Sequence, residues 1–145
     1  MAGFVKIGNH EYLGTVKLND SVTAGVENGT FVTVDFATSL AVPCAANTGA
    51  VWFVENEIDT VEEEYMNGNN LDFTVVAGKY LKLKKLLPGM VFVTTKFAGT
   101  PAVGDVLDVS TTGILAATTL TPLQSFTVIE KPVLWGKTCC TCIAN

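Results

Sequence analysis

Three cysteines stand close together near the end of the sequence, at Cys139, Cys140 and Cys142, and Cys44 lies far from them. Clustered thiolates are ligands of structural zinc sites, but such sites need four ligands and usually a two-residue gap between paired cysteines. Cys44 or His10 would have to complete the set. Adjacent cysteines also pair poorly as a disulfide, because their Cα atoms are about 3.8 Å apart. A metal site, an intersubunit disulfide and free thiols stay open, and the spacing favours free thiols without metal or cofactor.

The other groups that could do acid–base chemistry are isolated. His10 is the only histidine and has no serine or cysteine beside it in the sequence, which favours a surface role over catalysis. Asp105 follows Gly104 in a Val-Gly-Asp-Val stretch, where bonding to the backbone of its own turn is favoured over a role as a catalytic acid. We therefore expect a protein that is not an enzyme.

Two charged clusters could bind partners. Acidic residues are dense over 55–64, which lacks the fixed oxygen spacing around a glycine that a calcium loop requires. A solvated acidic face is therefore favoured over a cation site or a contact with a basic partner. Lys79, Lys82, Lys84 and Lys85 form the basic cluster. They could meet an acidic partner, or they could mark a solvent-facing strand edge on which lysines deter aggregation.

These groups are carried by a series of short β-strand patterns. The segments 30–36, 90–97 and 126–130 are rich in valine, threonine and phenylalanine, and turn residues separate them. Lysine alternates with leucine over 79–86, which indicates another strand. The pattern predicts a mainly β fold, a compact antiparallel β-sandwich or barrel with at most one short helix. That helix would fall within 55–70, where an acidic loop is the alternative.

The spacing of these patterns suggests three parts. Residues 1–20 hold few core signals and are predicted to form an extended N-terminal arm, residues 21–138 a β-rich domain, and residues 139–145 a cysteine-containing tail. Phe31–Phe36 and Phe92–Phe97 agree at four of six positions. Two topologically equivalent strands of a duplicated fold would explain this similarity, and so would chance in a chain of this composition.

Composition narrows the class of partner. The net charge is −5, and all nine basic residues are lysines, so a chain without arginine forks is a poor candidate for binding nucleic acid. No apolar run approaches the roughly 18 residues of a membrane span, and the first residues lack a signal-peptide layout, so we expect synthesis in a cytoplasm and no membrane contact. Only 16% of residues are charged, which suggests that subunits or a partner cover part of the surface.

Four segments together resemble a known family. They are Val-Val-Ala-Gly-Lys-Tyr-Leu-Lys-Leu at 75–83, Pro-Gly-Met-Val-Phe-Val-Thr at 88–94, Val-Gly-Asp-Val-Leu at 103–107 and Phe-Thr-Val-Ile-Glu-Lys at 126–131. This pattern of strands and turns, over about residues 70–132, resembles small capsid decoration (cement) proteins of tailed bacteriophages. The resemblance implies a homotrimer or dimer that binds the major capsid protein. It would lie on the outer surface of the virion and stabilise the shell.

Under this hypothesis the capsid contacts would be apolar residues of the arm and lysines of the basic cluster: Phe4, Val5, Ile7, Tyr12, Leu13, Lys79, Lys82 and Lys84. The alternative is a β-sandwich binding module, such as a head-fibre or carbohydrate-binding domain. It requires a pocket with an exposed aromatic side chain. Trp52, Trp135 and Tyr65 are the candidates for that side chain.

Overall fold

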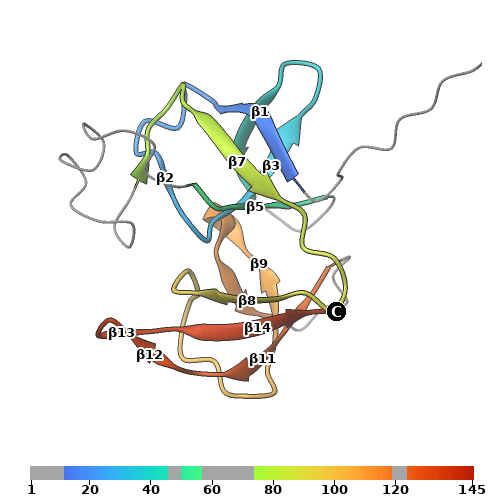
Figure 1. Cartoon of the computed structure of the whole chain (residues 1–145), viewed down its shortest axis with the longest axis vertical. Coiled ribbons are helices and arrows are strands. Elements are labelled where there is room, and N and C mark those ends of the chain that lie inside the picture. Colours follow the sequence, from blue (N-terminus) through green and yellow to red (C-terminus); the bar gives the residue numbers. More distant parts are fainter. Residues whose placement is uncertain (1–11, 46–49, 57–73, 119–123) are drawn as a thin grey trace, which may run out of the picture.

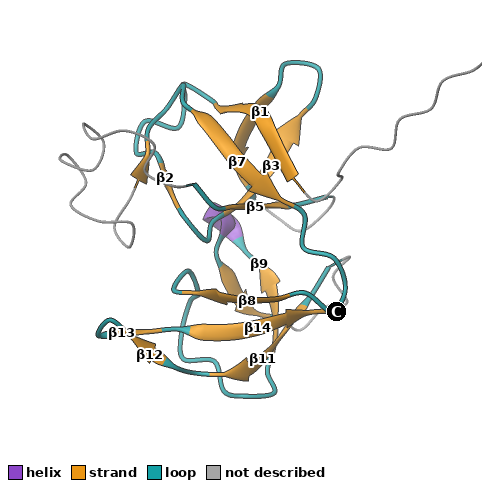
Figure 2. Cartoon of the chain, in the orientation of Figure 1, coloured by secondary structure: helices purple, strands orange, loops and turns teal. Residues whose placement is uncertain are grey.

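The computed structural model describes residues 12–45, 50–56, 74–118 and 124–145, and these are organised almost wholly as β-strands. The mainly β fold predicted from the sequence is confirmed, with a single 3-10 turn as the only helical piece in the described segments (Figure 2). Two five-stranded units lie one above the other, the first half of the chain forming one and the second half the other (Figure 1).

The first unit is a closed barrel of β1 (Tyr12–Leu18), β3 (Phe31–Asp35), β4 (Leu40–Pro43), β5 (Trp52–Val54) and β7 (Tyr80–Lys84), flanked by the short pair β2 (Val26–Glu27) and β6 (Thr74–Val75). The second unit contains β8 (Val91–Thr94), β9 (Val106–Val109), the 3-10 turn η1 (Thr111–Gly113), β10 (Leu115–Ala117), β11 (Phe126–Glu130) and β14 (Cys140–Ala144), with the hairpin β12 (Val133–Leu134) and β13 (Lys137–Thr138) inserted before the last strand.

Both units have the same strand connectivity. In the first, strand one (β1) pairs in parallel with strand three (β4) and antiparallel with strand five (β7), while strand two (β3) pairs with strands three and four. The second unit repeats these pairings with β8, β9, β10, β11 and β14. Its ring is closed only by a parallel bridge of Phe97 with Leu115, where the Ala98 N–H donates to the Leu115 carbonyl at 2.7 Å.

The repeat in the fold is not the one suggested by the sequence. Phe31–Phe36 covers β3, the second strand of its unit, whereas Phe92–Phe97 begins in β8, the first strand of its own. Of the two interpretations left open by the sequence, that of equivalent strands is therefore wrong for these segments, which leaves chance similarity. The same mixture of β-branched and aromatic residues suits any half-buried strand, so similar composition does not specify an equivalent position.

A phenylalanine cluster joins the two units. Phe31 and Phe53 from the first barrel meet Phe92 and Phe126 from the second, with ring centroids 5.2–6.2 Å apart. All four side chains are buried in one core, while a separate cluster around Leu81 fills the first barrel. Burying a phenylalanine stabilises by about 1.5–3 kcal/mol, so separating the units would cost several such contributions. The single domain predicted over 21–138 is thus two barrels with a shared core.

The predicted arm over residues 1–20 is wrong for residues 12–18, which form β1 between β4 and β7. Val16 and Leu18 of this strand are buried in the first barrel. The alternation of buried and exposed side chains in this strand is short and includes a glycine, so the period-two pattern is weak in the sequence. Residues 1–11 lie outside the described residues.

The predicted tail is also wrong, because β14 lies between β11 and β8. Cys140, Cys142 and Ala144 point into the shared core, and Thr141 and Ile143 alternate with them. A buried cysteine behaves as a small hydrophobic residue, so this segment has the alternation of an ordinary core strand. The cysteines are part of the fold rather than an appendage.

Candidate interaction site at the seam between the barrels

A groove of about 620 Å³ lies along the seam, where β8 of the second barrel passes the ends of β5 and β7 of the first. This volume falls within the range of about 300–1,000 Å³ that is typical of ligand pockets. We call it the seam groove. Its lining residues are Asn28, Gly29, Phe53, Val54, Glu55, Lys84, Val91, Phe92, Val93, Thr94, Thr95, Leu134, Trp135, Lys137 and Cys139.

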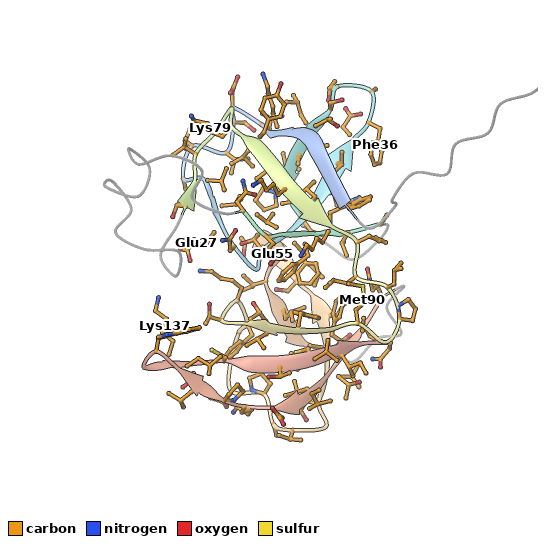
Figure 3. The ribbon with its side chains drawn as sticks, viewed as in Figure 1. Glu27, Phe36, Glu55, Lys79, Met90 and Lys137 are labelled. Carbon is orange, nitrogen blue, oxygen red and sulfur yellow. The ribbon has the colours of Figure 1, made fainter. Side chains whose placement is uncertain are left out.

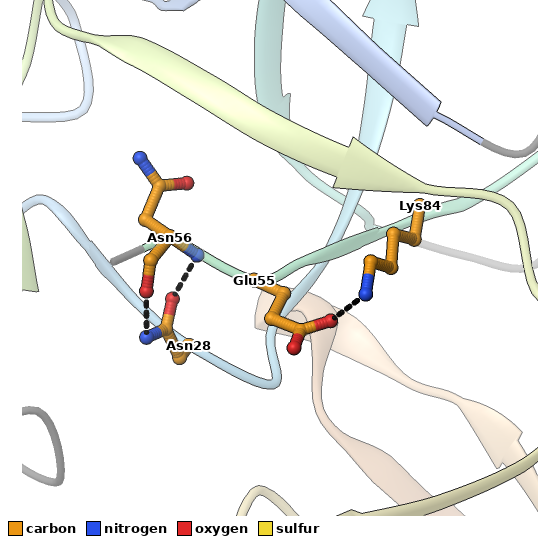
Figure 4. Close-up of polar contacts among 4 residues, drawn as sticks. All are labelled: Asn28, Glu55, Asn56 and Lys84. Atoms are coloured by element: carbon orange, nitrogen blue, oxygen red, sulfur yellow. Dashed lines mark hydrogen bonds and ion pairs between the residues drawn. The ribbon is translucent and has the colours of Figure 1, made fainter.

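The first barrel supplies a polar wall held in place by two asparagines. The Asn28 side chain donates to the Asn56 carbonyl and accepts from the Asn56 N–H, both at 2.7 Å (Figure 4). The buried Asn56 amide in turn donates to the Tyr80 carbonyl at 3.1 Å and accepts from the Lys82 N–H at 2.8 Å. These bonds tie the turn before β3 to β5 and β7, which fixes the position of the wall.

A single ion pair gives this wall its charge. Lys84 Nζ lies 2.6 Å from Glu55 Oε2, and both side chains are about half exposed. Lys84 is the last residue of β7, and Glu55 directly follows β5. Because these two strands pair, the barrel itself brings the two side chains together. Figure 3 shows Glu55 and Glu27 at the level of the seam. The wall therefore presents a hydrogen-bond donor, the Lys84 ammonium, beside an acceptor, the Glu55 carboxylate.

The second barrel supplies an apolar wall. Val91 and Val93 on β8 are 56% and 46% exposed, while Phe92 and Thr94 turn inward. Over Val91–Thr94, β8 pairs with β14 and is the last strand of its sheet order. This wall is therefore both apolar and a strand edge.

Trp135 stands at the rim of the groove, on the tip of the β12–β13 hairpin. It is 77% exposed, and its φ of 49° precedes a φ of 76° at Gly136, which gives a two-residue turn in the left-handed region at both positions. Such turns favour asparagine, aspartate or glycine, and a bulky residue there costs roughly 1–2 kcal/mol. The chain thus holds a large aromatic ring in solvent at a position that does not favour it. Strain of this kind is most often found at functional sites.

Of the two predicted aromatic candidates that the structure describes, one is exposed at a pocket. Trp135 fulfils that expectation, whereas Trp52 is only 9% exposed and packs in the first barrel, with Lys85 Nζ 5.8 Å from its ring centroid. Burial lowers the pKa of Lys85, whose ammonium also donates to the Val51 carbonyl at 3.4 Å. Tyr65 lies outside the described residues.

The predicted basic cluster is spread over the outside of the first barrel. Lysines and Tyr80 face outward on β7, while Leu81 and Leu83 are buried, as the alternation predicted. The interpretation of these lysines as guards of a sheet edge is wrong, because β7 lies between β1 and β5. Only Lys84 reaches the seam groove, and Lys79 lies at the far end of the barrel (Figure 3).

The predicted arm contacts are only partly placed by the structure. Tyr12 and Leu13 are the first residues of β1, and they pair with Lys84 and Leu83 of β7. The other three arm residues lie outside the described part of the chain, namely Phe4, Val5 and Ile7. The chain therefore enters the first barrel beside Lys84, at the wall of the groove.

The four cysteines are buried and occur as thiols, with no disulfide within the chain. Cys44, Cys140 and Cys142 belong to the shared core, whereas Cys139 lines the seam groove and its thiol donates to the Lys137 carbonyl at 3.4 Å. Burial raises the pKa of Cys142 to about 12 and also raises the pKa of Cys140. Both therefore stay protonated at neutral pH, which disfavours nucleophilic chemistry.

The remaining candidates have simple positions. Asp105 accepts from the Ala102 N–H at 2.8 Å, which confirms its predicted role in its own turn. His10 and residues 57–64 of the acidic run are outside the described segments. Among the described residues, no group of three histidine, cysteine or acidic side chains is arranged to hold a metal ion, and no helix is long and apolar enough to cross a membrane.

No protein-family model, curated protein or solved structure matches this chain. The indications of function therefore come from its own surface. The seam groove went unnoticed in the sequence because its walls come from segments far apart in the chain. A local signal existed only for its rim, where Trp135-Gly136 separates two short apolar or β-favouring pieces in the manner of a two-residue hairpin.

Proposed function

We propose that the protein is a structural virion component, a decoration protein that attaches to the outer surface of a bacteriophage capsid and stabilises the shell. The second barrel provides the attachment face. The observation that supports this assignment is the exposed apolar surface of the second barrel, together with the uneven distribution of charge between the two halves of the sequence.

The second barrel is electrically neutral and displays much apolar surface. Residues 91–145 contain three lysines and three acidic residues, so the whole net charge of −5 falls on residues 1–90. Among the described residues, eight large apolar side chains of the second barrel are exposed. They are Val91, Val93, Val103, Val106, Ile129, Val133, Leu134 and Trp135. Depletion of charge around exposed apolar and aromatic residues is typical of the centre of a protein–protein interface.

Attachment to a shell suits this division of the surface. The neutral barrel would face the capsid, and the half of the chain that carries the net negative charge would face solvent. Many identical copies would each add a modest interface, so their sum would oppose expansion of the shell. The protein would associate with itself as a homotrimer or dimer, and the major capsid protein would be its partner. The expected contacts of Lys79, Lys82 and Lys84 lie on the other barrel and are a separate prediction.

Binding to empty capsids of the phage that encodes the chain tests this proposal. The double variant Val106→Lys/Ile129→Lys places charge on two exposed apolar positions of the second barrel, and Val76→Lys is a matched control at an exposed valine of the first. Sedimentation with capsids should show a loss of occupancy for the double variant only, with similar melting temperatures for all three proteins. Equal occupancy of all variants would contradict the assigned face. Failure of the unaltered protein to bind would contradict the decoration function itself.

A second candidate function is a carbohydrate-binding module, and Trp135 is the observation that favours it. An exposed indole at the rim of a groove with the Glu55–Lys84 pair combines a stacking surface with hydrogen-bonding groups. Screening an oligosaccharide array with the unaltered protein and with Trp135→Asn tests this candidate. Asparagine suits the left-handed turn, so the variant should fold at least as well and lose all sugar signals. If the unaltered protein bound no sugar, the carbohydrate-binding candidate would be rejected and only the decoration proposal would remain.

A further inference from the structure

The strand β8 has an open edge. The Ala144 N–H donates to the Met90 carbonyl at 2.9 Å, and the register continues with Cys142 opposite Phe92 and Cys140 opposite Thr94. In an antiparallel ladder, the residues between hydrogen-bonded pairs point their backbone groups the other way. The backbone N–H and C=O groups of Val91 and Val93 therefore point away from β14. On that side, the described chain places no strand beside β8.

This edge faces the seam groove. Every residue from Val91 to Thr95 lines the groove, although successive side chains leave a strand on opposite faces. A groove that contacts both faces must run along the edge between them. Natural sheets protect such edges with charges, proline or bulges, yet Val91–Thr95 contains neither a charged residue nor proline. The edge therefore has the features of a site for β-strand addition.

The chain enters the first barrel beside this groove. Tyr12 is the register partner of Lys84, which lines the groove wall. Eleven residues precede Tyr12 in the sequence, and an extended chain of that length spans roughly 36 Å. The five edge residues 91–95 need only about 17 Å. About half of the segment's extended length therefore suffices to line the edge, and the other half is left for the path from Tyr12.

The composition of the segment suits an added strand. It contains Phe4, Val5 and Ile7 on either side of Lys6, and these three apolar residues favour β-structure. Their apolar side chains match the exposed faces of Val91 and Val93, and cross-strand pairs of this type stabilise a sheet. Tethering at Tyr12 raises the effective concentration of the segment at the groove.

We propose that residues 1–11 add a strand to the open edge of β8 in the seam groove. This assigns Phe4, Val5 and Ile7 to the groove instead of the shell contact that the sequence alone suggested. The added strand would cover Val91 and Val93, but Val106 and Ile129 of the proposed attachment face lie outside the groove, so the inference does not depend on the decoration proposal.

Amide hydrogen exchange, measured by NMR on the full chain and on a variant without residues 2–8, tests the proposal. The N–H groups of Val91 and Val93 should exchange about tenfold faster or more in the shortened variant. Those of Phe92 and Thr94 are the internal control, because their ladder pairs with β14 remain. Unchanged exchange at Val91 and Val93 would overturn the proposal. An equal rise at all four amides would also overturn it, because the segment would then stabilise the barrel as a whole.

A disulfide cross-link gives a second test that does not rely on deletion. Val5→Cys combined with Val93→Cys should oxidise rapidly, while Val5→Cys combined with Val42→Cys, on β4 of the first barrel, should not. Equal cross-linking of both pairs would contradict a defined site. Mass spectrometry of the product then assigns the contact: an intrachain bond to the same copy, or an interchain bond to a second copy that receives the same strand.

Discussion

The two barrels have the same ring of strands but close it differently. In the first, β1 pairs with both neighbours, through Lys17–Leu40 and Leu18–Ala41 on one side and along β7 on the other. In the second, the corresponding strand β8 reaches β10 only through the bridge at Phe97, which follows the strand. The same connectivity thus produces a sealed barrel in one case and an open edge beside a groove in the other.

The hydrophobic cores of the two barrels also differ, because only the first barrel has a core made entirely of its own residues. The first barrel has a core of its own around Leu81, whereas the core of the second barrel includes Phe31, Phe53 and Leu86 from the first half of the chain. The second barrel therefore depends on the first for its packing. A repeated topology therefore need not give two independent domains. One copy can act as a scaffold while the other presents neutral, apolar surface and an incomplete sheet.

The largest expected effect comes from the shared core. Phe126→Ala removes a fully buried ring that contacts both Phe31 and Phe92, and should lower the free energy of unfolding by about 3–5 kcal/mol. Because the core is shared, calorimetry should show a single transition that shifts as a whole. Leu81→Ala, inside the first barrel, is the control and should also shift one transition. Two transitions, of which only one moves with each variant, would show that the barrels unfold independently.

The sequence predicted those strands whose side chains alternate clearly. β3, β7, β8 and β11 fall within their predicted segments because a period of two is a local signal. β14 was missed, because its cysteines suggested chemistry instead of small core residues. The strands that complete each ring are also distant in sequence, as with β1 and β7 or β8 and β14. No local pattern specifies such pairings, so neither the two barrels nor the seam groove between them could be predicted.

The next effect concerns the close approach of the two barrels at η1. Gly113 has a φ of 74°, its N–H donates to the Cys44 carbonyl at 2.9 Å, and an added Cβ would clash with the Phe31 carbonyl oxygen. Gly113→Ala therefore forces the barrels apart and should cost more than about 2 kcal/mol. Gly99→Ala is the matched control, since its φ is 72° but nothing lies within 4 Å of the added atom.

Urea denaturation of both variants measures this difference. Gly99→Ala should lose only the roughly 1–2 kcal/mol that left-handed backbone costs an alanine. Equal losses for the two variants would mean that the seam tolerates separation at Gly113. That result would weaken the description of the two barrels as one packed body.

A smaller effect is expected in alkaline solution, and it belongs to the shared core. Burial raises the pKa of Cys142 to about 12, above the value of about 8.5 for an exposed thiol. A folded-state pKa above the unfolded value means that stability is fully present below about pH 8.5 and is lost progressively as the pH rises towards 12. Melting temperatures from pH 7 to 11 should therefore fall more for the unaltered protein than for Cys142→Val. Parallel profiles would indicate that the thiol is not desolvated.

The smallest expected effect compares an ion pair across the seam with one inside the first barrel. Lys96, which follows β8, pairs with Glu27 on β2, whereas Lys84 and Glu55 both belong to the first barrel. Partly exposed pairs contribute about 0.2–1 kcal/mol, and salt screens them. Lys96→Met and Lys84→Met should each lower stability by an amount in that range at low ionic strength, as measured by urea denaturation.

Amide exchange distinguishes the two variants, because only Lys96→Met loosens the seam. This variant should speed exchange at Gly29, whose N–H bonds to the Val54 carbonyl at the groove. If Lys84→Met accelerated that amide equally, the polar wall and the seam would form one cooperative unit, and the first barrel could not be considered a scaffold separate from the interface.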